Sequence, residues 1–167
     1  MNLKIINSIV FIYTLTFVCG SAQAQDTVRI GVTGLTCSSC SKAVEREMIK
    51  ISFVKSVIMN LNTNEATVII DDIQQVDWSK LAKSVYNAGF SVGYFNVPSC
   101  NKSDIAFGDK DCKQAYQYIG PSDRLPDADY YHLVGKYFMD KKTYSKWQAI
   151  LKELPKTDLK EPIYYYY

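Results

Sequence analysis

The sequence predicts an α+β fold in which two helices cover one face of an antiparallel four-stranded sheet. Between residues 27 and 97, some runs of apolar residues alternate with a period of two, and others recur every three to four residues. These runs follow one another in the order βαββαβ, which is the split βαβ or ferredoxin-like arrangement. Residues 98–167 are predicted to form a small β-rich module with one helix at about 140–153.

Composition and charge set outer limits on the function. The 167 residues suffice for one ordinary domain or two small ones, and 47% of them are hydrophobic, which favours a folded chain. The formal net charge of +2 is close to balance. Neither a nucleic acid nor a membrane surface is therefore indicated as a partner.

Residues 1–24 are interpreted as a cleaved secretory signal. A mostly apolar run from Ile5 to Val18 follows Lys4, and Ala22-Gln23-Ala24 supplies the small residues that a signal peptidase reads. We therefore expect a periplasmic or secreted protein, with no membrane anchor after cleavage. A retained anchor and a lipoprotein modified at Cys19 are the alternatives.

The first strand is expected at Thr27–Thr33, followed by a helix from Ser38. Alternate residues of the strand, Val28, Ile30 and Val32, share one face. Thr36 or Ser38 is the expected helix cap. The buried face of the helix is expected to hold Cys40, Val44, Met48 and Ile51.

A hairpin and a second helix complete the domain at about residue 97. The hairpin joins Phe53–Leu61 to Ala66–Ile70 through a turn at Asn62–Glu65, and a strand is expected at Phe90–Val97. In the first hairpin strand, Val57, Met59 and Leu61 are expected to share one face. The second helix should start after Asp77, end at Gly89, and bury Trp78, Leu81, Ala82, Val85 and Ala88.

The chemistry of the sequence is concentrated in Cys37 and Cys40, which lie between the first strand and the first helix. A CxxC pair serves soft metals, zinc half-sites, disulfide exchange or a plain disulfide. Unpaired N–H groups and the dipole at a helix start favour thiolates. Two thiolates with few other donors suit Cu(I) or Hg(II), whereas zinc normally takes four ligands. The serines beside the cysteines are interpreted as loop and cap residues that leave the thiols accessible.

The stretch Gly34-Leu35-Thr36-Cys37-Ser38-Ser39-Cys40 resembles the loop of heavy-metal-associated domains. The resemblance extends through Val44-Glu45 and Phe53-Val54-Lys55-Ser56-Val57 to Asn87-Ala88-Gly89-Phe90, and covers about residues 26–97. This family includes copper chaperones, modules of copper-transporting ATPases and the periplasmic mercury-binding protein. The resemblance implies metal ligation by Cys37 and Cys40.

The resemblance also implies which residues surround the cysteines. Leu35 stands where many members have methionine, so it should pack under the loop without offering a thioether. Phe90 should lie beside the loop and shield it, and Thr36 completes these surroundings.

The function expected from this part of the chain is soft-metal binding without catalysis. We expect a carrier or sequestering protein, with Cu(I) as the favoured ion and Hg(II) as the alternative. Its expected partner is a metal-transporting membrane protein or another copper protein. A thiol-disulfide accessory role and an interaction module built on the C-terminal part are the competing hypotheses.

The C-terminal part is matched to no family. Strands are expected at Ala115–Ile119 and Tyr130–Phe138, and Ile163–Tyr167 is expected as an edge strand or an exposed aromatic tail. Asp140 should cap a helix whose apolar face carries Tyr144, Trp147, Ile150 and Leu151.

Three other side chains with ligand chemistry lie in this part, together with Met139. Cys100 and Cys112 are expected to form a structural disulfide in an oxidising compartment, with a second thiolate site as the alternative. His132 is expected to be packed or solvated rather than a ligand, and Met139 is expected in the core.

Overall fold

The computed structural model describes residues 27–71, 76–99, 116–119, 130–154 and 163–166. The predicted signal segment, Cys100 and Cys112 lie outside the described residues. Among the described helices, none is long and apolar enough to cross a membrane.

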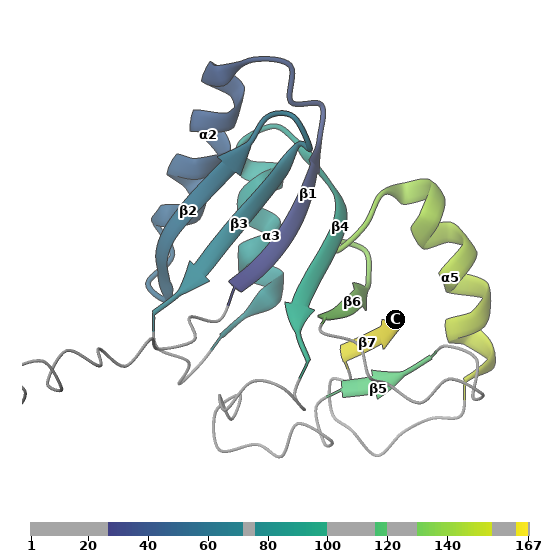
Figure 1. The fold of residues 1–167 in the computed structure, drawn as a ribbon. Helices are drawn as coiled ribbons and strands as arrows, with labels where there is room; N and C mark the ends of the chain where they lie inside the picture. The colour runs from purple at the N-terminus through teal and green to yellow at the C-terminus, as the bar shows by residue number, and fades with distance from the viewer. Residues whose placement is uncertain (1–26, 72–75, 100–115, 120–129, 155–162, 167) are drawn as a thin grey trace, which may run out of the picture.

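The first part of the chain has the predicted βαββαβ order. Its elements are β1 (Thr27–Thr33), α2 (Ser38–Ile49), β2 (Val54–Asn60), β3 (Glu65–Ile70), α3 (Trp78–Asn87) and β4 (Ser91–Pro98). The strands are antiparallel in the order β2-β3-β1-β4, with β1 in the interior (Figure 1). The predicted ferredoxin-like fold is confirmed.

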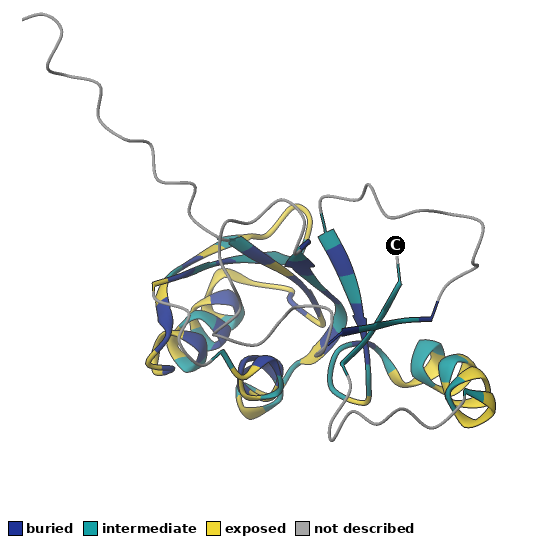
Figure 2. Cartoon of the chain, turned by 90° about the horizontal axis from the view of Figure 1, so that it is seen from below, coloured by how far each residue is buried: buried dark blue, intermediate teal, exposed yellow. Residues whose placement is uncertain are grey.

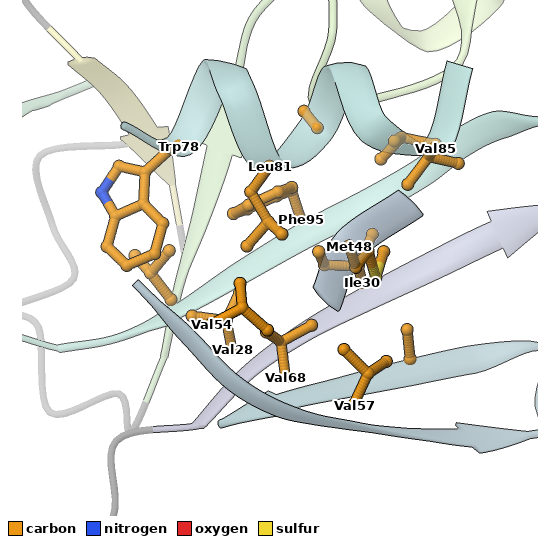
Figure 3. Close-up of a cluster of buried hydrophobic side chains, with 14 of the residues drawn as sticks. Val28, Ile30, Met48, Val54, Val57, Val68, Trp78, Leu81, Val85 and Phe95 are labelled. Atoms are coloured by element: carbon orange, nitrogen blue, oxygen red, sulfur yellow. The ribbon is translucent and has the colours of Figure 1, made fainter. Parts of the chain in front are cut away.

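Both α2 and α3 pack on the same face of these strands. Ile30 of β1, Met48 of α2 and Leu81 of α3 are all fully buried in one cluster (Figure 3). Burying side chains of this size contributes roughly 1.5–3 kcal/mol each. Most of the expected inward positions are buried, whereas Cys40 and Ala88 are half-buried.

The predicted hairpin is present with shifted strand ends, since β2 begins at Val54 rather than Phe53 and β3 begins at Glu65 rather than Ala66. β2 ends at Asn60, whose side-chain oxygen accepts hydrogen bonds from the N–H groups of Asn62 and Thr63. Asn64 takes a positive φ of 53°, as turn chemistry allows. Leu61 therefore lies in the turn with 44% of its surface exposed, and the prediction that it belongs to the strand was wrong.

The C-terminal strands extend the same sheet. They are β5 (Tyr116–Tyr118), β6 (Tyr130–Val134) and β7 (Ile163–Tyr166), and α5 (Lys141–Glu153) lies between β6 and β7 in the chain. The seven-stranded order is β2-β3-β1-β4-β6-β7-β5, so the sheet continues across residue 98 through the antiparallel β4–β6 pair. Strand pairing thus joins the two parts of the chain at the β4 edge.

Two strand predictions in this region need correction. The run to Phe138 was expected to be extended, but β6 ends at Val134 and a turn follows, in which the N–H of Phe138 donates to Gly135. The segment after Pro162 does form a strand. It is not an edge strand, because β7 lies between β6 and β5.

Helix α5 covers the face of the sheet opposite to α2 and α3. Along β7, Tyr165 belongs to the main core, whereas Tyr164 and Tyr166 belong to a second cluster with Trp147 of α5. Helix α5 has no buried residue, and Figure 2 shows it with exposed and half-buried positions only. Ile150, expected on its apolar face, is 43% exposed.

Candidate metal site

The cysteine loop begins where β1 ends. Gly34 has a φ of +92°, a conformation that favours glycine, and it turns the chain out of the sheet. Leu35 then points into the core, with 6% of its surface exposed. With the loop fixed at this residue, Cys37 and Cys40 lie at the start of α2.

Cys37 is itself the N-cap residue of α2. Its backbone is extended, and its carbonyl oxygen accepts the N–H groups of Cys40 and Ser41 at 3.1 and 3.2 Å. No side chain caps the helix by a hydrogen bond, so the expected cap at Thr36 or Ser38 was wrong. The positive end of the helix dipole is left beside the cysteine side chains.

The thiol of Cys37 is exposed and has a strongly lowered pKa. Its sulfur lies 3.0 Å from Oγ of Ser39. Hydrogen bonding by the thiol of Cys40, then by the hydroxyl of Ser39 and the backbone N–H of Cys40, lowers the pKa of Cys37 from 9.0 to about 7. The lowered pKa favours the thiolate, which is the form that ligates metal.

Cys40 lies deeper than Cys37. Its side chain is half-buried and packs against the core, and Oγ1 of Thr36 lies 4.0 Å from its sulfur. Both cysteines are free thiols. The pair therefore has one sulfur open to solvent and one partly sheltered by the domain.

Leu35 and Phe90 both lie close to the cysteine loop. Leu35 is buried beneath the loop, as described above. Phe90 follows Gly89, whose φ is +87°, and packs against the core. A Cβ at Gly34 would lie 3.7 Å from Cδ1 of Phe90, so this ring flanks the start of the loop.

Two other side chains with ligand chemistry, His132 and Met139, have packing contacts of their own. Nδ1 of His132 shares a hydrogen bond with Oδ1 of Asn96, and its ring stacks on Tyr166 at 5.0 Å. Met139 is buried, with 3% of its surface exposed. Within the part of the chain that the structure describes, no three or more His, Cys, Asp or Glu side chains gather as a metal cluster.

Ser39 has a more specific place than the sequence indicated. It was predicted to be one of several small loop and cap residues, yet its hydroxyl contacts the sulfur of Cys37. A hydroxyl residue between the two cysteines was the available signal. Which of the neighbouring serines would turn toward the sulfur depends on the geometry of the first helical turn.

The fold and the site together define a class of protein: a ferredoxin-like domain that presents two cysteines at the first turn of the helix after β1. The Heavy-metal-associated domain family matches residues 29–91. A relative that is 36% identical over 67 residues, with 72% of its length covered, supports the same assignment. The chain belongs to the heavy-metal-associated domain family.

Two groups of relatives share this domain. The 36% identical relative is the mercuric transport protein periplasmic component of Serratia marcescens, matched over 40% of this chain. A copper-exporting P-type ATPase of Staphylococcus aureus (strain Newman) is 31% identical over 71 residues, which are 42% of this chain and 9% of the ATPase.

Similar solved structures cover the same part of the chain. Oxidized MerP from Ralstonia metallidurans CH34 is 35% identical with a TM-score of 0.37, and covers 41% of this chain and 97% of its own. The CopZ metallochaperone is 29% identical with a TM-score of 0.37, and covers 40% of this chain and 97% of its own.

Proposed function

We propose that the protein is a carrier or sequestering protein for a soft metal ion, with Cu(I) as its first cargo. The ion binds to the sulfurs of Cys37 and Cys40. The observation that carries the proposal is the exposed Cys37 thiol with its pKa near neutrality, beside a second free thiol at a helix start.

The electrostatics at the start of α2 suit two neighbouring sulfur anions. The unpaired N–H groups and the dipole of α2 stabilise negative charge there. Hydrogen bonds from the Cys40 thiol, the Ser39 hydroxyl and the Cys40 backbone lower the pKa of Cys37 and so favour its ionised form. A soft, monovalent ion of low coordination number matches a two-thiolate site.

The unequal exposure of the two sulfurs favours transfer of the ion. Cys37 is exposed, so a thiolate of a partner can approach the ion on that side as a third ligand. Cys40 can keep the ion until the partner has bound, because it is held against the core. Ligand exchange of this kind moves the ion without releasing it to water, and it requires no catalytic residue of the chain.

Hg(II) is the alternative cargo. Both ions are soft and take thiolates at low coordination number, and the relatives of this chain include a mercuric transport component and a copper-exporting ATPase. The mercuric relative also supports a periplasmic location. A metal-transporting membrane protein or another copper protein is the partner that we propose.

Anaerobic titration of the reduced protein tests the proposal. Cu(I), and in parallel Hg(II), is added against a competing chelator to the parent and to C37S, C40S and C37S/C40S. We expect one ion per chain for the parent and no specific binding for the double variant. S38A keeps both thiols and serves as the matched control. Stoichiometric binding that survives in C37S/C40S would contradict ligation by these sulfurs.

The lowered pKa of Cys37 also favours a second candidate function, thiol-disulfide exchange. That role requires a dithiol-disulfide couple with a reduction potential near that of the compartment, and turnover with a dithiol substrate. Equilibration with glutathione buffers measures the potential. A Cys37–Cys40 disulfide much more stable than the compartment's couple, with no exchange, would remove this candidate.

A further inference from the structure

Two lysines from separate parts of the chain meet over one aromatic ring. Nζ of Lys83, on α3, lies 5.1 Å from the centroid of Tyr137, and Nζ of Lys136 lies 5.6 Å from the same centroid. Lys136 and Tyr137 belong to the turn between β6 and α5. Tertiary packing therefore brings two ammonium groups that are 53 residues apart in sequence (136 minus 83) to the same ring.

The turn that carries Lys136 is anchored on both sides of the ring. Tyr137 packs edge-on against Tyr86 of α3, with centroids 5.9 Å apart at 75°. The next residue, Phe138, packs against Phe95 of the core at 5.1 Å. The two lysines are thus attached to ordered backbone, and their pairing is a property of the fold.

Neither lysine of this surface forms an ion pair within the described residues. Within the described residues, the ion pairs join Lys50 to Glu47 and Lys55 to Asp71, so neither Lys83 nor Lys136 takes part. An acid that acts on this region is Asp140, whose charge contributes to the raised pKa of Tyr86 and whose carboxylate accepts N–H groups at the start of α5. The face of Tyr137 offsets part of the repulsion between the ammonium groups. Both lysines are exposed and keep N–H donors for an outside acceptor.

We propose that Lys83, Tyr137 and Lys136 form a docking surface for a carboxylate-rich segment of a partner protein. The net charge of +2 is too small to attract acidic proteins to the whole molecule, so the attraction is local. Carboxylates of the segment accept charge-assisted hydrogen bonds from both ammonium groups. The half-buried Tyr137 ring offers apolar contact to the part of the segment that lies between these carboxylates.

This docking surface lies on the side of the domain near the cysteine loop. Tyr86 lies in the last turn of α3, and its carbonyl oxygen accepts the N–H of Gly89. Phe90, the next residue, flanks the start of the cysteine loop at Gly34. A partner held at Tyr137 is therefore bound on the side of the domain where α3 returns to that loop. The docking surface itself does not depend on which ion the thiols bind.

Binding of a hexaglutamate peptide to the full reduced chain, followed by NMR at near-physiological salt, tests the proposal. We expect saturable shifts at the Tyr137 ring and the Lys83 and Lys136 amides, and none with hexaserine. K83E/K136E should weaken binding about tenfold or more. K83Q/K136Q should weaken it less, because it removes the attraction without adding repulsion.

The matched control reverses two exposed lysines of α5, as K146E/K152E, with the same change in net charge. We expect this control to bind within about twofold of the parent at this salt concentration. Equal weakening by both charge reversals would show general attraction and overturn the proposal. Shifts centred elsewhere, or no saturable binding, would overturn it as well. Unchanged Cu(I) affinity in K83E/K136E separates this result from any failure of the metal site.

Discussion

The indole N–H of Trp78 donates a hydrogen bond to the phenolic oxygen of Tyr116, at 2.7 Å, inside the protein. Trp78 begins α3, and Tyr116 begins β5 at the far end of the sheet order. Both side chains are buried, with 5% and 8% of their surfaces exposed. This bond joins the heavy-metal-associated domain to the C-terminal strands across the common core.

The variant Tyr116→Phe tests that connection. It keeps the ring but removes the hydroxyl, so we expect a loss of about 1 kcal/mol in the free energy of unfolding. Because both parts share one core, tryptophan fluorescence and far-ultraviolet circular dichroism should report a single transition in urea. Two separate transitions in the parent would show that the parts unfold independently.

Stability should fall in alkaline solution because of buried phenols. Burial raises the pKa of Tyr116, and burial together with the hydrogen bond to Glu65 raises the pKa of Tyr94 to about 12. The unfolded pKa is about 10, so the folded state holds these protons more tightly. The stabilisation is complete below pH 10 and is lost as the pH rises through the folded values.

Urea unfolding at a series of alkaline pH values measures this loss, while tyrosinate absorbance follows ionisation. We expect a cooperative rise in absorbance that accompanies unfolding. Independent titration of all tyrosines near pH 10, in a protein that remains folded, would be the contrary result.

The variant Ser39→Ala should raise the pKa of Cys37. It removes the hydroxyl that lies 3.0 Å from the sulfur, while the Cys40 contacts remain. The pH dependence of iodoacetamide alkylation, or of thiolate absorbance, gives the value. We expect a midpoint above the parent's value of about 7 and an unchanged midpoint for the control Ser38→Ala. A midpoint equal to the parent's in Ser39→Ala would show that this hydroxyl does not act on the thiolate.

The variant Gly31→Ala should destabilise the protein by forcing a steric clash with the Tyr94 ring. A Cβ at Gly31 would lie 2.3 Å from Cε1 of Tyr94, whose hydroxyl donates to Glu65 at 2.7 Å. The ring must move and give up that bond, so we expect destabilisation of roughly 1–3 kcal/mol. Thermal or urea unfolding measures it.

The background variant Tyr94→Ala shows whether the ring is the cause. In that background Gly31→Ala should cost much less, because the space above Gly31 is open. Equal costs in the two backgrounds would place the strain elsewhere than in the contact with Tyr94.

The parts of the fold that could be predicted are those with local signals. Asp77 accepts the N–H of Lys80 as the expected helix cap, and Gly89 takes the expected positive φ after α3. Capping and turn chemistry act over three or four residues, so residues that are adjacent in sequence are enough to predict these features. The cap of α2 was mispredicted because several hydroxyl residues compete there, and none of them bonds to the helix start.

The sequence by itself determined the βαββαβ order and the position of Cys37 and Cys40 at the start of a helix. Periodicity and spacing within one segment contain that information. Only the tertiary structure decided that β6 pairs with β4, that β7 lies inside the sheet, and that Lys83 and Lys136 meet over Tyr137. Every strand edge offers the same backbone N–H and C=O groups, so the choice of neighbour depends on how distant side chains pack together.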